Sequence, residues 1–417
     1  MKNKKRYFFW DALGGTIFLL LIMGIVSVIP FGDVFNPVEK MLGDFQLTDV
    51  VFSQLRTNPD FDDHITVVNI GNLDREGIAE QINIINKYNP KVIGIDAFFR
   101  KPKSEQGDSA LRKAFSEVKN LVLVSELIED EGNSRIDTLK NSHPMFMQYA
   151  QTGFADMVTE GKDVFKTSRI CIPKDIIDNS VVPSFPTKLA QIYNPAAANL
   201  YLNRNKDTEV INFRGNIDTR KEGVSNNSKG VFYVLDVRQV LDEEFDPSVI
   251  KDKIVIMGFL GADVNENVWT DKFFTPLNAN YIGKTYPDMY GVIVHANIVS
   301  MILAGSFIDE MPEYLNTCLS LILIFLNIWF LTCCFFKLKE WYDGGSNIIV
   351  LVEALILMFI VVLIFNKFNY KFDISLVIVA LFLSGNMIEI YHGVLKLGFN
   401  TIRKKFLSLK GNKSTSL

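Results

Sequence analysis

An aspartate interrupts an otherwise apolar stretch, KVIGIDAFFR, between Lys91 and Arg100. Burying the carboxylate of Asp96 costs free energy unless another group pairs with it. Asp96 therefore either contacts a ligand or is a structural carboxylate that holds an arginine or caps a neighbouring segment. We expect Asp96 to pair with Arg75 or Arg214, or to cap a neighbouring backbone.

A second group of polar residues lies in the segment VWTDKFFTPL and in the apolar helix that follows it. Thr270, Asp271 and Thr275 can bind their own backbone and fix this loop, or they can line a pocket. His295 lies inside the helix, where a histidine can bind metal or respond to pH. No second histidine or cysteine stands at ligand spacing, so we expect a packed histidine that hydrogen-bonds a loop.

Motifs of the common enzyme classes are absent from the sequence. We find no nucleophilic triad, no phosphate-binding loop and no zinc motif. The segment GFLGAD has two glycines after a predicted strand but lacks the G-x-G-x-x-G spacing of a dinucleotide site. We therefore predict no enzymatic activity, no catalytic residue, no metal site and no cofactor.

Short apolar runs alternate with helical periodicity between the first and second long apolar segments. Ile78, Ile82 and Ile85 recur at the spacing of one helix face, and Pro90 ends that helix. This alternation predicts an α/β domain with a mostly parallel sheet and flanking helices. The predicted strands are Ile65–Gly71, Lys91–Phe99, Leu121–Leu127, Gly153–Val158, Thr208–Gly215 and Lys253–Gly261; the last long helix is Met289–Gly305. The less regular region Glu129–Asp246 leaves a division into two sub-domains open.

Functional groups in parallel sheets gather at the carboxyl ends of the strands. Asp74 and Arg75 follow the first predicted strand, Asp96 lies near the end of the second, and Arg214 ends a later one. We expect these residues to meet on one rim of the sheet. The ligand-binding or rim candidates are Asp74, Arg75, Asp96, Arg214, Thr270, Asp271, Thr275 and His295.

Four apolar segments are long enough to cross about 30 Å of hydrocarbon. Lysines and arginines precede the first segment and follow the last, which places both chain ends in the cytoplasm. The predicted order is a cytoplasmic N-terminus (1–7), transmembrane helix 1 as a signal anchor (8–30), an extracytoplasmic domain (31–312), transmembrane helices 2 to 4 (315–336, 348–365 and 372–390) and a basic cytoplasmic tail (391–417).

Polar side chains inside the predicted spans are candidates for coupling between helices. Glu353 and Glu389 lie at similar depth near the predicted cytoplasmic side, and His392 shares a helix face with Glu389. A contact among these three can stabilise the bundle or couple it to a partner, and interfacial snorkelling is the alternative. Asn327 can hydrogen-bond another helix or a second subunit.

Charge and cysteine content narrow the class of protein. The net charge of −4 gives no support for nucleic-acid binding, which needs a clustered basic surface. Cys171 is the single cysteine of the predicted external domain, so that domain has no internal disulfide and must rest on its own core.

Segments in order over some 270 residues resemble the CHASE2 domain, an extracytoplasmic sensor module of bacterial signalling receptors. The resemblance begins at GDFQLTDVVFSQLR, with Asp49 and Arg56, and continues through ITVVNIG, VIGIDAFF, GDSALRKAF, GFADMV, SRI, VPSFPTKLAQIY, INFRG, VLDVRQVLD, KDKIVIMGFLG, TDKFFTPL and YGVIVHANIVSMILAG. One span before the domain and three after it are similar to the usual arrangement of the family. Two departures stand out: Asn69 and Asn72 replace the common aspartate after the first strand, and no output domain follows the last span.

The resemblance implies a sensor in the bacterial inner (cytoplasmic) membrane. Its external domain is expected to bind an unknown ligand or protein, and the transmembrane helices are expected to relay this event to a separate cytoplasmic or membrane effector. A homodimer is possible by analogy with two-subunit receptors. The alternative is a structural or accessory subunit of an envelope complex, with the domain as a protein-binding platform. A transporter or membrane enzyme is the least supported reading.

Overall fold

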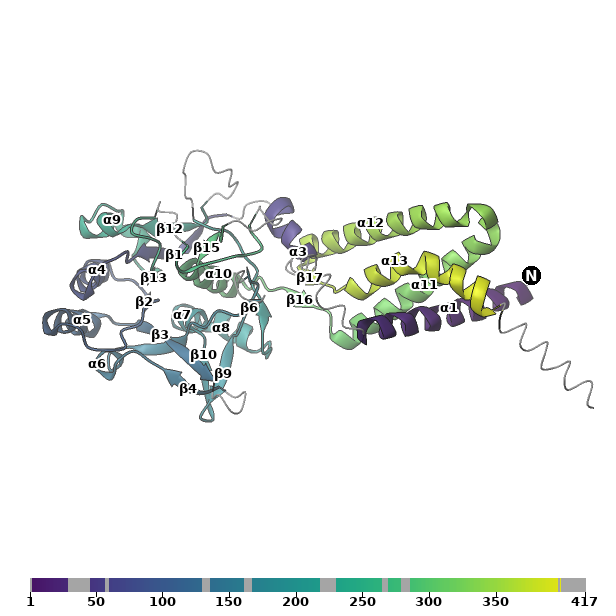
Figure 1. Cartoon of the computed structure of the whole chain (residues 1–417). Helices are drawn as coiled ribbons and strands as arrows, with labels where there is room; N and C mark the ends of the chain where they lie inside the picture. Colours follow the sequence, from purple (N-terminus) through teal and green to yellow (C-terminus); the bar gives the residue numbers. More distant parts are fainter. Residues whose placement is uncertain are drawn as a thin grey trace, which may run out of the picture. The chain divides into compact units, whose positions relative to one another are not determined.

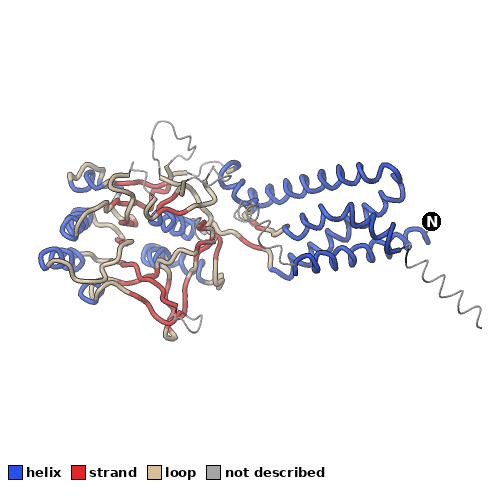
Figure 2. Tube along the Cα trace, viewed as in Figure 1, coloured by secondary structure: helices blue, strands red, loops and turns tan. Residues whose placement is uncertain are grey.

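The computed structural model describes residues 2–28, 46–56, 60–129, 136–160, 167–217, 230–264, 269–278, 286–396 and 398. The chain forms two compact units, one of Lys40–Ile308 and one of Met1–Glu39 with Asp309–Leu417. The first unit combines strands and helices, whereas long helices make up most of the second (Figure 2).

A seven-stranded sheet forms the centre of the unit Lys40–Ile308. Its strand order is β12-β1-β13-β2-β3-β4, and β5 also pairs with β3. Every pairing is parallel except β3 with β4, which confirms the predicted mostly parallel sheet. The strands are β1 (Asp62–Asn69), β2 (Val92–Ile95), β3 (Leu121–Glu129), β4 (Ile136–Lys140), β5 (Gln151–Phe154), β12 (Phe232–Leu235) and β13 (Ile254–Gly258).

Helices cover both faces of this sheet (Figure 1). On one face, apolar side chains of α4 and α5 pack with alternate strand residues such as Ile93 and Ile95. On the other face, Gly94 lies against Phe185 and Leu189 of α7. The helices of the first face are α4 (Arg75–Lys87), α5 (Glu105–Glu117), α6 (Pro144–Met147) and α9 (Val237–Leu241); those of the second are α7 (Phe185–Tyr193), α8 (Pro195–Leu202) and α10 (Gly291–Ala304).

The predicted strand Thr208–Gly215 is wrong as a member of the main sheet. Only β11 (Glu209–Val210) forms, and it pairs antiparallel with β8 (Ile170–Cys171). The chain beyond it is held by a side chain of α10, because Asn297 accepts hydrogen bonds from the backbone N–H groups of Arg214 and Gly215. The edge position that the sequence left unassigned is taken by β12.

Several short elements complete this unit. They are α3 (Leu47–Val50), the π-helical turn Val51–Leu55, the 3-10 turn Pro247–Val249, and the strand pairs β6 (Thr159–Glu160) with β7 (Thr167–Ser168), β9 (Lys174–Ile177) with β10 (Ser180–Pro183), and β14 (Lys272–Phe273) with β15 (Met289–Tyr290).

The second unit contains four helices that are long and apolar enough to cross a membrane, as predicted. They pack through a shared apolar core. Large apolar side chains such as Leu21 and Phe359 stay exposed, as expected for surfaces that face lipid. The elements are α1 (Lys2–Val28), α11 (Glu313–Leu338), α12 (Tyr342–Phe368) and α13 (Ser375–Ile390), with short turns at Lys339–Trp341 and Tyr391–Lys396 and the strand pair β16 (Asp309–Glu310) with β17 (Tyr370–Lys371).

Close packing of α1 against Tyr391 depends on a glycine. A Cβ atom on Gly14 would overlap the Oη atom of Tyr391, whereas a Cβ on Gly24 would meet nothing within 4 Å. We expect Gly14→Ala to destabilise the helical unit by about 1–3 kcal/mol, because the tyrosine ring must move out of its place. Thermal unfolding in detergent micelles measures this loss, and Gly24→Ala is the matched control. Equal midpoints for the two variants would contradict the packing role.

Candidate functional site

Asp96 leaves the carboxyl end of β2 on the face that α10 covers. Its backbone N–H donates to the carbonyl of Met257 at 2.8 Å, which extends the pairing of β2 with β13 by one residue. Gly258 ends β13 beside it, and a Cβ on this glycine would lie 3.4 Å from the Cβ of Asp96 and 2.8 Å from Val292 of α10. Asp96 therefore lies between the ends of two central strands and the first turn of α10.

Two further predicted residues lie with Asp96. The Nε2 atom of His295 is 3.9 Å from Oδ2 of Asp96, too far for a hydrogen bond. The carboxylate oxygens of Asp271 would lie 3.5 Å from a Cβ on Gly291, the first residue of α10. The backbone carbonyl of Asp271 also accepts a hydrogen bond from the N–H of Gly291 at 3.0 Å. We call Asp96, Asp271 and His295 the rim cluster.

Among the described residues, no lysine or arginine forms an ion pair with the carboxylates of the rim cluster. Burial raises the pKa of Asp96 to about 7, and the charge of Asp271 contributes to the same shift. Loss of solvation raises the pKa of Asp271 to about 6, although the residue as a whole is exposed. Burial lowers the pKa of His295 to about 3, so its imidazole is neutral and does not compensate either carboxylate.

Other buried carboxylates of the same unit have positively charged partners. Asp108 pairs with Arg75, Asp49 with Arg169, and Glu209 with Arg204. In the described part of the chain, Asp96 has no lysine or arginine within ion-pair distance, although its side chain is only 16% exposed. Asp288 likewise has no lysine or arginine partner among the described residues, but its carboxylate accepts two hydrogen bonds from Thr275. Asp96 differs from the paired carboxylates because a carboxylate that serves only the fold is usually compensated when it is shielded from water.

The expected pairing of Asp96 with Arg75 or Arg214 is wrong. Arg75 lies on α4, where it binds the carboxylate of Asp108 and stacks over Phe146 at 5.1 Å. Arg214 lies near the start of β1, at the amino ends of the strands and so away from the rim, with its NH1 atom 3.4 Å from Oδ2 of Asp62. Arg214 was expected on the rim because Thr208–Gly215 was predicted as a parallel strand of the main sheet. That strand does not form.

The remaining rim candidates have local structural roles. Asp74 caps α4 by accepting a hydrogen bond from the N–H of Gly77 at 2.9 Å. The hydroxyl of Thr275 donates to Asp288 at 2.5 Å, and its N–H donates to the same carboxylate at 2.8 Å. Thr270 is exposed in the turn between Trp269 and Asp271. Asp74 thus fixes a helix end and Thr275 fixes the loop, which is the first of the two interpretations given for the loop segment.

An exposed aromatic pair lies next to the rim cluster, and the sequence analysis missed it. The backbone N–H of Lys272 donates to the carbonyl of Trp269 at 3.3 Å, so Trp269 and Asp271 share one tight turn. Asp271 has a left-handed backbone in this turn, with φ of 60°. The ring of Trp269 lies 5.3 Å from the ring of Tyr286, and the two residues are 53% and 56% exposed. The signal available in the sequence was the presence of Trp269 and Tyr286 in polar loop segments, because large aromatic side chains exposed there often mark binding surfaces.

Asn69 at the end of β1 is also central to the rim, through hydrogen bonds rather than charge. Its Oδ1 accepts from the N–H groups of Gly71 and Leu260, both at 2.9 Å. Its Nδ2 donates to Asp236 at 2.9 Å and to the carbonyl of Gly261 at 3.1 Å. This fully buried amide therefore fixes the turn that follows β13.

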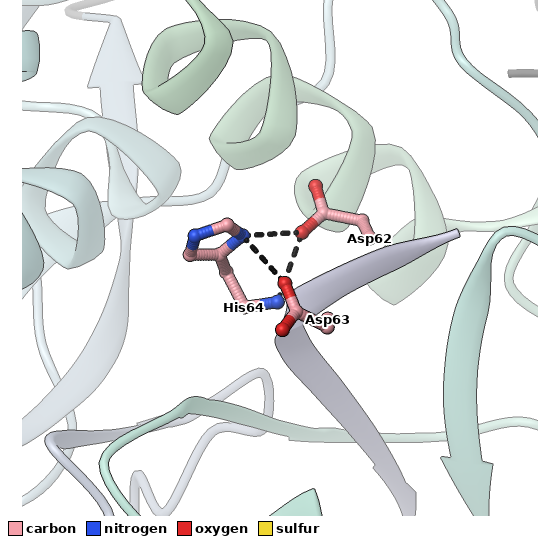
Figure 3. Close-up of side chains that lie close together, drawn as sticks. All are labelled: Asp62, Asp63 and His64. Carbon is pink, nitrogen blue, oxygen red and sulfur yellow. Dashed lines mark hydrogen bonds and ion pairs between the residues drawn. The ribbon is translucent and has the colours of Figure 1, made fainter. Parts of the chain in front are cut away.

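Asp62, Asp63 and His64 form the one group in the described ranges in which three potential metal-ligand atoms lie within 4.8 Å of one another (Figure 3). The group lies at the start of β1. Its carboxylates already have partners: Ser300 and Arg214 for Asp62, and Lys253 at 3.2 Å for Asp63. These contacts balance the charge that a metal ion would otherwise balance.

In the helical unit, one of the predicted coupling contacts forms between α11 and α12. The Nδ2 atom of Asn327 donates to Oε2 of Glu353 at 2.5 Å. His392 stacks on the ring of Phe335 with centroids 5.1 Å apart. Glu389 lies on the exposed side of α13, near the end of that helix. Asn327 therefore hydrogen-bonds another helix, as predicted, and its partner there is Glu353.

Comparison with known proteins identifies the domain. The sequence profile of the CHASE2 domain matches residues 18–336, from within α1 to within α11. No curated protein and no solved structure matches the chain. The profile covers well over half of the 417 residues, including the whole sheet and the rim cluster. The chain is therefore a member of the CHASE2 domain family.

Proposed function

We propose that the protein is a membrane sensor whose CHASE2 domain lies outside the cytoplasm and detects a ligand at the rim cluster. Family membership supports the sensor role, and the four apolar helices support a multi-pass membrane protein. The basic residues before the first and after the last apolar segment favour cytoplasmic chain ends. That orientation puts the domain on the extracytoplasmic side of the bacterial inner membrane.

The observation that carries the proposal is the position of α10. This helix begins beside Asp271 and Asp96, and all but its last two residues are buried. It ends at Gly305, whose left-handed φ of 58° closes the helix, and α11 begins eight residues later at Glu313. A ligand that moves the first turn of α10 thus acts on a buried helix that only eight residues of chain separate from the membrane-spanning helix α11.

The alternative proposal is an accessory subunit of an envelope complex, and one observation favours it. Ile176 and Val181 lie opposite each other in the β9–β10 pair and are 66% and 62% exposed. Paired apolar side chains on an exposed hairpin are suited to contact another protein.

Site-specific photo-crosslinking of the full-length protein in its native membrane separates these functions. A crosslinker replaces Trp341, between α11 and α12, or Ile176, with the lipid-facing position Phe359 as the control. A signalling enzyme or regulator attached through position 341 supports a sensor with its effector on a separate chain. Envelope-assembly proteins attached only through position 176 support the accessory subunit and contradict the sensor proposal.

A further inference from the structure

Two stretches of chain that lead to apolar helices meet at one buried amide. We call Gln46–Arg56, which follows α1 along the chain, the entering segment, and Gly305–Ile308, which precedes α11, the leaving segment. The NH1 atom of Arg56 donates to Oδ1 of Asn212. The Nδ2 atom of Asn212 donates to the backbone carbonyl and to the hydroxyl of Ser306, both at 3.0 Å. One side chain, 5% exposed, therefore binds both segments.

The hydrogen bonds of Asn212 fix which way its amide points. Both N–H groups of Nδ2 are directed to oxygen atoms of Ser306, and the Oδ1 acceptor is directed to a guanidinium group. With the amide turned over, its oxygen would face the Ser306 carbonyl and its NH2 group would face a cation. Burial lowers the pKa of Arg56 to about 10, so this cation is charged at neutral pH and the reversal would be costly. The amide thus keeps one orientation as long as both segments are in place.

The entering segment packs on Ile211–Phe213, the buried stretch that does not join the sheet. The rings of Phe52 and Phe213 meet edge to face, with centroids 6.3 Å apart. Two nitrogen atoms of Arg169 donate to the two carboxylate oxygens of Asp49, at 3.2 and 2.8 Å, and both residues are buried. The carbonyl of Arg169 accepts a hydrogen bond at 2.8 Å from the backbone N–H of the first residue of the stretch. The entering segment therefore has a fixed place beside Asn212.

The leaving segment is held by contacts of its own. The ring of Phe307 stacks on Tyr201 with centroids 5.5 Å apart, and the guanidinium of Arg204 lies 4.8 Å from the centroid of the same ring. The NH2 atom of Arg204 also donates to the carbonyl of Ile308 at 3.3 Å. Ile308 is fully buried. A force on this segment is therefore carried by the segment as a whole.

The chain continues from the leaving segment into a backbone pairing of the helical unit. The N–H of Asp309 donates to the carbonyl of Asn369 at 2.9 Å. The N–H of Met311 donates to the carbonyl of Lys371 at 3.1 Å, and the carboxylate of Glu310 lies 3.2 Å from Nζ of the same lysine. Asn369 and Lys371 belong to the connection between α12 and α13. A displacement of the leaving segment thus reaches this connection as well as α11.

We propose that Asn212 is a junction that makes the entering and leaving segments move together, so that the domain acts on α1 and α11 in concert. Arg56 binds the acceptor and thereby orients the amide, and this orientation aims both donors at Ser306. Loss of one side frees the amide and weakens the other, which is a reciprocal coupling. The inference rests on the sensor function proposed above only for its use in signalling, because the coupling itself is a property of the fold.

Hydrogen–deuterium exchange of the full-length protein in detergent micelles, read by mass spectrometry, tests the junction. Arg56→Met removes the donors of the entering segment and keeps an unbranched side chain over the ring of Phe52. We expect amide exchange in residues 306–311, on the other side of Asn212, to accelerate by about fivefold or more, the size of effect that one net hydrogen bond supports. In Asn212→Ala this exchange is already fast, and adding Arg56→Met should not accelerate it further.

Arg100→Met is the matched control. Arg100 also lies over a phenylalanine ring, 4.2 Å from the centroid of Phe98, and it pairs with Glu126. Its substitution should leave exchange in residues 306–311 unchanged. Exchange in α4 reports on unfolding of the whole domain and should stay unchanged in every variant.

Asn212→Asp tests the junction without removing the entering side. The carboxylate keeps an acceptor for Arg56 and loses both donors to Ser306. Exchange should accelerate in residues 306–311, whereas residues 47–56 should stay protected. Unchanged exchange in residues 306–311 of Arg56→Met or of Asn212→Asp would overturn the proposal. Equal acceleration by Arg56→Met with and without the Asn212 side chain would also overturn it.

This measurement fails separately from the test of the proposed function. Exchange needs no effector, and crosslinking to an effector needs no junction. An effector attached through position 341 without the coupling overturns the junction and leaves a sensor that acts through the leaving segment alone. Coupling without an effector supports the junction and contradicts the sensor proposal.

Discussion

We expect Asp96→Asn to be more stable than the wild-type protein at pH 8. Burial raises the pKa of Asp96 from 3.8 to about 7, so folding disfavours the ionised form. The free energy of unfolding therefore falls as the pH rises from about 4 to about 7, and the loss is complete above pH 7. The amide removes this penalty, which is worth up to about 4 kcal/mol for a shift of this size.

Thermal unfolding across the pH range from 4 to 8 measures this effect. The midpoint of Asp96→Asn should exceed that of the wild type at pH 8, and the difference should vanish near pH 4, where Asp96 is protonated in both folded and unfolded chains. Asp63→Asn, at an exposed carboxylate paired with Lys253, should show no gain at pH 8. A lower midpoint for Asp96→Asn at pH 8 would mean that the ionised carboxylate supports the fold.

A stabilising substitution at Asp96 would also bear on function. Residues that weaken the fold are retained where they do chemistry or bind a ligand. The same experiment decides between the ligand-contacting and the structural interpretation of Asp96.

The parallel sheet could be predicted because its central strands are continuous apolar runs. Every residue of β2 and β13 is buried. Such continuous apolar strands are typical of a parallel sheet with helices on both faces, so both layers could be predicted from the sequence. The edge strand β12 was missed although Val231 to Leu235 form a continuous apolar run, because this short run lies in the less regular region Glu129–Asp246, for which few strands were predicted. The segment after β11 was misassigned because its apolar residues Ile211 and Phe213 are buried without joining the sheet.

Membership of the rim could be predicted only in part. Asp96 and His295 stand out in sequence because they interrupt apolar segments, and both reach the cluster. Their ion-pair partners could not be predicted, because Arg75 meets Asp108 through the packing of α5 against α4, a tertiary contact with no local sequence signal. The aromatic pair Trp269–Tyr286 likewise joins residues from two separate segments.

The second large effect is expected for Asn69→Asp, which places a carboxylate at the end of the first strand. The buried amide donates to Asp236 and to the carbonyl of Gly261. A carboxylate cannot donate, so the variant places two carboxylates in contact and leaves one carbonyl without its donor. We expect a loss of about 3–5 kcal/mol at pH 8, measured by thermal or urea unfolding.

A matched control and a rescue make this expectation specific. Asn83→Asp introduces the same charge on the exposed side of α4 and should change stability by less than about 0.5 kcal/mol. The double variant Asn69→Asp/Asp236→Asn restores one donor and one acceptor across the same contact, so it should recover part of the loss. Equal stability of the single and double variants would show that the Asn69–Asp236 hydrogen bond is not the cause. Recovery would instead show that the first strand of this chain ends in an amide because its neighbour Asp236 supplies the carboxylate of this contact.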